Sequence, residues 1–303
     1  MEEGKPSFTA EIDAVIRTIE SEKPESERLC YDPFARGFLS TTNRVIGMIP
    51  PLSKLALWYL ERKHPFILDC IPARTRYIDE YVDTCIDDGL NQLIILGAGY
   101  DSRAYRIERL QGKVTVFEVD HPATQTLKIE KVKKMLDPLP SNVVYVPIDF
   151  NKEKLSQKLF QSGYDKNKKN LFIWEGVTPL ITAEAVDETL HFVAKNSGPG
   201  SSIIFNYILK SVVDGTCQVE KAGEIRRAFS RGGLADFRSN RGDRLLFGIE
   251  EGTIETFLSE RGFYQIKDIS GDYYEAEYFK GPNSNRKGCC LCRVVYAMVK
   301  PKE

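Results

Sequence analysis

Short apolar runs recur along the chain after about residue 90. They are QLIILGAG, KVTVFEVD, NVVYVPIDF, NLFIWEG, SSIIFNYIL, YQIKDIS and RVVYAMV. β-Branched and aromatic residues fill these runs, and stretches of helix length separate most of them. Continuous apolar runs are typical of strands that a parallel sheet buries on both faces. The pattern predicts an α/β protein with an open, doubly wound sheet of seven strands, the first of them at Leu93.

Apolar residues before about residue 90 follow the helical period instead. The segments AEIDAVIRTIE, PLSKLALWYLERKH and ARTRYIDEYVDTCIDDG place apolar side chains three or four positions apart, as on one face of a helix. Prolines suit the start of the second segment, and Gly89 suits the end of the third. A further helix is predicted at EEGTIETFLSERGF, ahead of the last two strands.

The 303 residues are within reach of one large α/β domain. We expect a single domain over residues 1–303. It comprises a helical N-terminal cap over 1–90 and a ligand-binding core over 91–210. A lid insertion is expected over 211–247, where the pattern fits neither period. The C-terminal helix and strands occupy 248–303.

Composition narrows the possible partners. The net charge is -1, so the field of the whole molecule favours neither nucleic acid nor an anionic membrane. No apolar run approaches the roughly 18 residues of a membrane helix. The start, MEEGKPSFTAEID, lacks the basic and apolar regions of a signal peptide. We expect a cytoplasmic protein that acts on a small molecule and binds neither nucleic acid nor membrane.

Three cysteines, Cys289, Cys290 and Cys292, lie close together near the C-terminus. A structural zinc ion needs four ligands with thiolate or imidazole spacing. Neither a second CxxC nor a nearby histidine follows these residues. We therefore predict no metal site, and interpret the cysteines as small apolar residues at the entrance to the last strand.

The first strand ends in a glycine-rich turn, Gly97-Ala98-Gly99. An open α/β sheet binds ligands beyond the carboxyl ends of its strands, and glycine lets a ligand approach the backbone closely. The second strand ends in Asp120, about twenty residues beyond the turn, where a carboxylate can accept hydrogen bonds from ribose hydroxyls. The spacing predicts a nucleoside site, although a glycine turn alone also serves as a structural turn.

The next two strands also end in acidic residues. Asp149 is followed by Phe150, and an acid beside an aromatic ring suits an adenine. The fourth run ends in Trp174-Glu175-Gly176. For any one of these acids, the alternative is a solvated loop carboxylate.

Nicotinamide dinucleotides and S-adenosylmethionine both contain ribose and adenine, and their phosphates distinguish them. A dinucleotide turn usually has a third glycine below a pyrophosphate. Here Ser102 takes that position, and Asp101 places a carboxylate within the turn. Because a carboxylate repels a pyrophosphate and tolerates a sulfonium, the charge favours S-adenosylmethionine. An NAD(P)-dependent oxidoreductase remains the alternative.

The motifs LIILGAGYDSRAYRI, VFEVDHP, PIDF and WEGV resemble the leucine carboxyl methyltransferase family and its microbial S-adenosylmethionine-dependent relatives. The resemblance extends upstream to TAEIDAVIRTIESEKPESERLCYDPFARGFL and ARTRYIDEY. It implies a Rossmann-like seven-stranded methyltransferase sheet with S-adenosyl-L-methionine as cofactor. The implied activity is methyl transfer by in-line displacement. A protein that binds the cofactor without catalysis is a further alternative.

The resemblance also implies roles for individual residues. Arg74, rather than Arg76, would bind the carboxylate of the methyl donor. The turn Gly97, Ala98 and Gly99 would pass close to the methionyl part. The remaining roles are ribose binding by Asp120, adenine binding by Asp149 and Phe150, and contact near the sulfonium by Glu175. Arg17 stands where the family has a basic residue near the donor.

One departure from the family concerns the acceptor. The family often has an aromatic in the run that follows its Glu-Gly pair, where this chain has Leu180. Methylation of a protein C-terminus is therefore in doubt, and we expect O-methylation of a carboxylate or hydroxyl on a small molecule. Tyr207 is a candidate contact for that acceptor. So are Arg238 and Arg241 in the lid, whose alternative is a solvated arginine-rich loop.

A last alternative concerns the segment PLSKLALWYLERKH. Its Leu52, Leu55, Trp58 and Tyr59 either pack in the core or form a wall of an apolar acceptor pocket. No catalytic base is assigned, because a carboxylate acceptor needs none.

Overall fold

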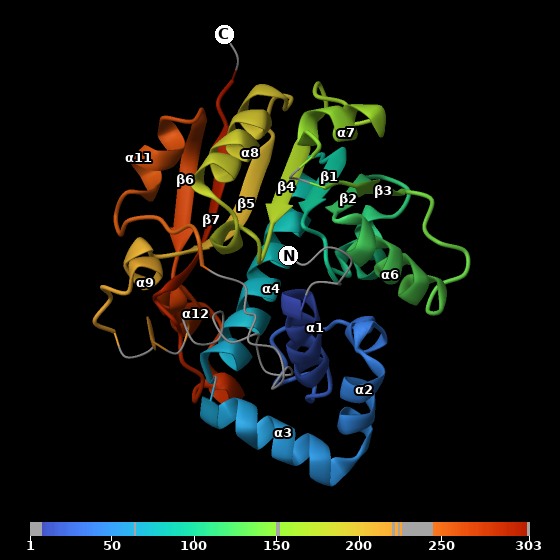
Figure 1. The fold of residues 1–303 in the computed structure, drawn as a ribbon, viewed down its shortest axis with the longest axis vertical. Helices are drawn as coiled ribbons and strands as arrows, with labels where there is room; N and C mark the ends of the chain where they lie inside the picture. The colour runs from blue at the N-terminus through green and yellow to red at the C-terminus, as the bar shows by residue number, and fades with distance from the viewer. Residues whose placement is uncertain are drawn as a thin grey trace.

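The computed structural model describes residues 8–63, 65–149, 152–219, 222, 223, 225 and 245–301. Seven strands form one sheet in the order β3-β2-β1-β4-β5-β7-β6 (Figure 1). They are β1 (Gln92–Leu96), β2 (Thr115–Asp120), β3 (Val143–Pro147), β4 (Asn170–Trp174), β5 (Ser202–Ile208), β6 (Phe263–Ile269) and β7 (Cys292–Val299). Five strands lie within the apolar runs, and β6 and β7 each begin one residue before theirs, so the predicted sheet is confirmed.

The strands are not all parallel. β1 pairs in parallel with β2 and β4, and β2–β3 and β4–β5 are parallel as well. β7 lies between β5 and β6 and is antiparallel to both. The apolar runs did not reveal this reversal, because a strand buried on both faces has the same pattern in either direction.

Burial on both faces explains why the apolar runs have no alternation. In β1, Ile94 and Leu96 pack into the apolar core on one face of the sheet, and Leu93 and Ile95 into the core on the other face. All four side chains are at most 2% exposed. The edge strand β3 has a weaker pattern, with most of its residues only half-buried.

Helices cover both faces and one edge of this sheet. They are α1 (Phe8–Ser21), α2 (Thr41–Met48), α3 (Pro50–Lys63), α4 (Pro65–Asp87), α5 (Arg103–Arg106), α6 (Pro122–Lys133), α7 (Leu155–Gln161), α8 (Ala183–Lys195), α9 (Lys210–Asp214), α11 (Ile254–Ser259) and α12 (Gly271–Glu277). The helices predicted in the N-terminal cap correspond to α1, α3 and α4. Within the described ranges, no helix combines the length and the apolar character needed to cross a bilayer.

The cap helices gather beyond the carboxyl ends of the parallel strands. Figure 1 shows α1 beyond the arrowheads of the central strands and α3 along the lower edge of the molecule. α1 packs against α4, and a short turn over residues 88–91 connects the end of α4 to β1. α1 therefore lies at the carboxyl ends of the parallel strands, although it is far from most of those strands in the sequence. Of the predicted lid over 211–247, residues 220, 221, 224 and 226–244 lie outside the described residues.

Candidate cofactor-binding site

The glycine turn follows β1 directly, as predicted. Gly97 and Gly99 have φ angles of +67° and +41°, in the left-handed region that favours glycine. A Cβ atom added to Gly97 would lie 2.3 Å from Val177 Cγ2, and one added to Gly99 would lie 2.9 Å from the Cβ of Ala10. The turn is therefore closed on one side by the loop after β4 and on another by α1.

Asp120 ends β2 beside this turn. Its Oδ2 accepts a hydrogen bond from the backbone N–H of Gly99, and its Oδ1 accepts one from the N–H of His121 at 2.6 Å. Burial raises the pKa of the Asp120 carboxyl above its usual 3.8, and the two N–H donors partly offset that rise. The carboxylate is thus fixed at the glycine turn, where the sequence predicted a ribose acceptor.

Glu175, the residue after β4, lies between two guanidinium groups. Arg74 of α4 donates from Nε to Glu175 Oε1 at 2.6 Å, and Arg103 of α5 donates from Nη1 to Oε2 at 2.7 Å. Arg74 also donates from Nη2 to Asp13 of α1 at 3.1 Å. Residues from α1, α4, α5 and the end of β4 therefore form one buried ion network.

Burial and charge act in opposite directions on the carboxyls of this network. Burial alone raises the pKa of Glu175, but Arg103 and Arg74 outweigh it and hold the pKa well below its usual 4.5. For Asp13, burial dominates and raises the pKa above 3.8 despite the attraction of Arg74. Glu175 is therefore the firmly ionised centre of the network.

The charge of Asp101 in the glycine turn differs from the prediction. Asp101 does not present a bare carboxylate within the turn, because it accepts hydrogen bonds from Arg103 through both the backbone N–H and Nη1. Arg103 and Arg106 also pair with Asp79 on α4, each at 2.8 Å. The acid of the turn is neutralised locally, so the charge that a ligand meets here is that of the whole cluster.

That cluster still has an excess of acid. Six carboxylates lie in it, against four arginines. The acids are Asp13, Asp32, Asp79, Asp101, Asp120 and Glu175, and the bases are Arg17, Arg74, Arg103 and Arg106. The formal balance is -2, the difference between these two sets. Such a site attracts a cationic ligand and disfavours a pyrophosphate.

Arg17, on α1, links this cluster to the glycine turn. Its Nη2 donates to the backbone carbonyl of Tyr100 at 2.6 Å, and its Nε donates to Asp32 at 2.9 Å. Arg76, which the sequence analysis set aside in favour of Arg74, lies on the outer side of α4. There it pairs with Glu80 and is 41% exposed. Of these two arginines, only Arg74 is brought to the site.

The sequence analysis missed Asn206, a buried polar residue within β5. Its Oδ1 accepts a hydrogen bond from the N–H of Gly176 at 2.6 Å, and its carbonyl accepts one from the hydroxyl of Thr178. These bonds fix the turn that carries Glu175. A lone amide in the apolar run SSIIFNYIL was the available signal, because a polar side chain in such a strand needs a partner.

Tyr207 does not lie where the sequence analysis placed it. It is part of β5 rather than beyond it and is 2% exposed. Its hydroxyl donates to Asp268 on β6 at 3.0 Å, and Asp268 also accepts a bond from Arg293 on β7. The side chain joins the antiparallel strands together, so its position does not support a contact with an acceptor.

The structure describes only some of the remaining predicted site residues. Asp149 follows β3 and its carboxylate pairs with Lys152 at 3.1 Å. Phe150, Arg238 and Arg241 lie outside the described residues. Cys292 opens β7 and Cys289 is 1% exposed, as expected for small apolar residues at that entrance, whereas Cys290 is exposed.

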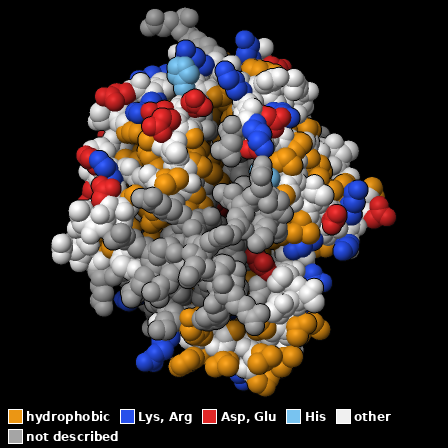
Figure 2. Space-filling view, in the orientation of Figure 1, with side chains coloured by type: hydrophobic (Ala, Val, Ile, Leu, Met, Phe, Trp, Pro, Cys, Tyr) orange, Lys and Arg blue, Asp and Glu red, His pale blue; other side chains and the backbone are white. Residues whose placement is uncertain are grey.

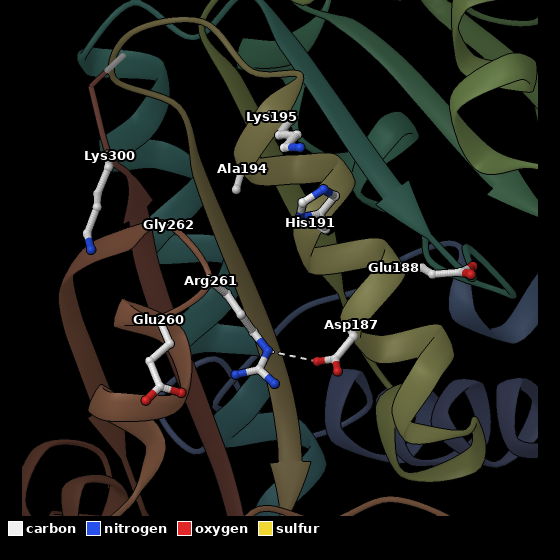
Figure 3. A pocket seen from close by; sticks show the side chains of 9 residues that line it. All are labelled: Asp187, Glu188, His191, Ala194, Lys195, Glu260, Arg261, Gly262 and Lys300. Atoms are coloured by element: carbon white, nitrogen blue, oxygen red, sulfur yellow. Dashed lines mark hydrogen bonds and ion pairs between the residues drawn. The ribbon is translucent and has the colours of Figure 1, made fainter. Parts of the chain in front are cut away.

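A separate groove of about 770 Å³ lies between α8 and residues 260–262, which lead from α11 into β6. It is lined from α8 by Asp187, His191 and Lys195, and from the far side by Arg261 and Lys300 (Figure 3). Arg261 is already paired with Asp187 at 2.7 Å. Because ligands of an open α/β sheet bind at the carboxyl ends of the strands, this groove is not the candidate site.

The sheet order and the position of the site define the class of fold. A solved structure from Thermobifida fusca YX, titled "Crystal structure of a putative methyltransferase", superposes with a TM-score of 0.56 at 13% identity, over 99% of this chain and 97% of that one. That likeness confirms the Rossmann-like α/β fold. The chain belongs to the leucine carboxyl methyltransferase family, whose model matches residues 10–194.

Individual relatives carry related names. A Bacillus subtilis (strain 168) protein named "Putative S-adenosyl-L-methionine-dependent methyltransferase YktD" is 37% identical over 135 residues, 45% of this chain and 44% of that protein. A Mycolicibacterium paratuberculosis protein, named "Putative S-adenosyl-L-methionine-dependent methyltransferase", is 27% identical over 253 residues, 80% of this chain and 78% of its own length. The match thus spans less than half the length of the Bacillus relative.

Proposed function

We propose that this protein is an S-adenosylmethionine-dependent methyltransferase that methylates an oxygen atom of a small molecule. The observation that carries the proposal is the acidic strand edge, where the glycine turn, Asp120 and Glu175 converge. Membership of the leucine carboxyl methyltransferase family supports the same reaction. The formal balance of -2 at this edge suits a donor whose sulfonium and ammonium are both cationic.

Each of the candidate residues has a part of the donor that its chemistry suits in this proposal. Arg74 would bind the carboxylate of the methionyl group, for which its planar fork is suited. The backbone of Gly97, Ala98 and Gly99 would lie against the methionyl chain, and Asp120 would accept the ribose hydroxyls. Asp149 and Phe150 would bind the adenine, and Glu175 would lie near the sulfonium.

The donor brings its own activated methyl group, so the protein chiefly has to position the acceptor and exclude water. A carboxylate acceptor attacks without a base, whereas a hydroxyl acceptor needs one. No residue at the described strand edge is assigned as that base. Leu180, in place of an aromatic, is consistent with an acceptor other than a protein C-terminus.

Calorimetric titration tests this function directly. S-Adenosylhomocysteine, the demethylated donor, is expected to bind with a stoichiometry of one, whereas NADH at the same concentration gives no binding heat. A screen of small carboxylic acids and alcohols with donor labelled in the methyl group then identifies the acceptor.

Two outcomes would replace the proposal. Binding of NADH and not of S-adenosylhomocysteine would indicate an NAD(P)-dependent oxidoreductase. Donor binding without labelled product across the whole screen would indicate a protein that binds the donor without catalysis.

A further inference from the structure

An apolar surface lies on α2 and α3, at the outer end of the helical cap (Figure 1). Six of the ten large hydrophobic side chains that the described residues expose fall on α2, α3 and the residue between them. They are Val45, Met48, Ile49, Leu52, Leu55 and Trp58, between 41% and 63% exposed. Figure 2 shows apolar side chains gathered at the end of the molecule where Figure 1 places α3. We call these six residues the apolar tip.

The apolar tip resolves an alternative left by the sequence. Leu52, Leu55 and Trp58 neither pack in the core nor line a described pocket, because all three face solvent. On the inner side of α3, Leu60 packs against Ile16 and Ile71 and anchors the helix to the body of the protein. α3 thus carries apolar side chains both on the side that packs against the protein and on the side that faces solvent. Contiguous exposed apolar surface of this kind marks a site of interaction.

The charge around the tip identifies the kind of partner. Residues 41–63 carry Arg44, Lys54, Arg62 and Lys63 against the single acid Glu61, a net charge of +3, whereas the whole chain carries -1. Within the described ion pairs, neither Arg44, Lys54 nor Arg62 has a carboxylate partner. The tip therefore combines apolar side chains with unneutralised positive charge on an otherwise acidic protein.

A second copy of the chain fits this surface poorly. A symmetric contact through the tip would place one segment of charge +3 against another of the same sign. An anionic surface instead neutralises the same charges. The tip is also a protruding end of the molecule rather than a groove, whereas apolar peptides dock in grooves (Figure 1).

The side chains suit the boundary between lipid headgroups and acyl chains. Helices that lie on membranes carry Lys and Arg on the polar side, and Trp and Leu on the buried side. Trp58 is 54% exposed, and Arg62 lies 5.8 Å from the centroid of its ring. A tryptophan beside a cation at the rim of an apolar face is typical of residues at the headgroup level.

We propose that the apolar tip docks the protein on a membrane surface of anionic lipid, without crossing it. The net charge of the whole chain and the lack of a spanning segment in the sequence predicted no membrane partner. Neither consideration applies to a local patch of charge +3 that needs to enter only the headgroup layer. The proposal rests on α2 and α3 and does not depend on the proposed methyl transfer.

Sedimentation with vesicles tests the docking. The full chain is expected to sediment with vesicles of phosphatidylcholine and phosphatidylserine at low salt, and to remain in solution with phosphatidylcholine alone. Trp58 reports the same event by a blue shift of its fluorescence, because the other tryptophan, Trp174, is already buried at 3% exposure. Raising the salt concentration should release the protein.

Matched variants assign the binding to the tip. Val45→Asp places a carboxylate at a tip position that is 46% exposed, and Val219→Asp does so at a position outside the tip that is 44% exposed. Val45→Asp should lower the partition coefficient about tenfold or more, because an apolar contact is lost. Val219→Asp should leave it unchanged. Lys54→Ala should lower it about fivefold, as expected for one cation near an anionic surface, and Lys166→Ala should not.

Thermal unfolding of each variant shows whether the fold is intact. Failure of the wild-type chain to bind phosphatidylserine vesicles at low salt would overturn the proposal. So would equal binding to neutral vesicles, or equal losses for Val45→Asp and Val219→Asp. A dimer that Leu55→Glu dissociates, without any vesicle binding, would show that the tip serves a second copy of the chain.

Discussion

At the scale of single residues, the buried charges of the site depend on one another. Glu175 stands at the centre, with Arg74 and Arg103 on either side. Removing one member of a buried pair leaves its partners without compensation, which costs more than the pair contributes when intact. The network therefore ties the stability of the protein to the same residues that are candidates for donor binding.

Replacing Glu175 with Gln should lower the free energy of unfolding by about 3–5 kcal/mol at neutral pH. The folded-state pKa of Glu175 lies below its usual 4.5, so its contribution is complete above that pH and is lost as the pH falls through the acid range. Urea unfolding at several pH values should show a steeper acid loss for the wild-type protein than for Glu175→Gln. Glu260→Gln, at an exposed position, is the control, and parallel curves for all three proteins would contradict the assignment.

Replacing Asp120 with Asn should weaken the binding of S-adenosylhomocysteine by about 1–3 kcal/mol, because charge-assisted hydrogen bonds to the ribose are lost. Burial raises the pKa of Asp120 above 3.8, so wild-type affinity should begin to fall at a higher pH than an exposed aspartate would give. Calorimetry across the acid range measures both effects, with the exposed Asp88→Asn as control. Wild-type affinity in Asp120→Asn would remove this residue from the ribose site.

Some residues of the site could be predicted from the sequence, whereas their ion-pair partners could not, for a physical reason. Asp120 and Glu175 follow recognisable strands, so their place at the edge could be predicted from local pattern. Asp13 and Arg74 are 61 positions apart, and Arg103 and Glu175 are 72 apart. Only the packing of α1 and α4 on the sheet brings such residues together, and no local pattern carries that information.

At the scale of elements, α1 and the loop after β4 enclose the glycine turn. The periods of the strands and of α1, α3 and α4 are local properties of the sequence and were predicted correctly. The antiparallel direction of β7 and the presence of α2 were not predicted. The eight residues of α2 bury none of their side chains, and therefore lack the apolar inner face on which a sequence prediction depends.

Substitution of two glycines with similar φ angles distinguishes the effect of packing from that of backbone strain. Gly97 has φ +67° and contacts Val177, whereas Gly112 has φ +69° and open space around it. Gly97→Ala should therefore destabilise the protein by about 1–3 kcal/mol more than Gly112→Ala. Adding Val177→Ala should recover part of the difference. Equal losses for the two single variants in urea unfolding would show that the turn is not tightly enclosed.

At the scale of the whole molecule, the site is assembled from α1, α4, α5 and the ends of β1, β2 and β4. A ligand that contacts all of these should stabilise the folded state globally. S-Adenosylhomocysteine at 100 times its dissociation constant should raise the free energy of unfolding by about 2.7 kcal/mol. Calorimetric scans should show a corresponding rise in Tm. NADH at the same concentration is the control, and a rise of equal size with NADH would contradict the exclusion of a ligand that carries a pyrophosphate.

The excess of two negative charges at the strand edge also bears on turnover. S-Adenosylmethionine carries a positive sulfur that its demethylated product lacks, while the rest of the two molecules is the same. A negative environment therefore holds the reactant more firmly than the spent molecule, and the attraction weakens at the moment when the methyl group departs. In the proposed methyl transfer, the electrostatics that attract the donor would thereby also help to release its product.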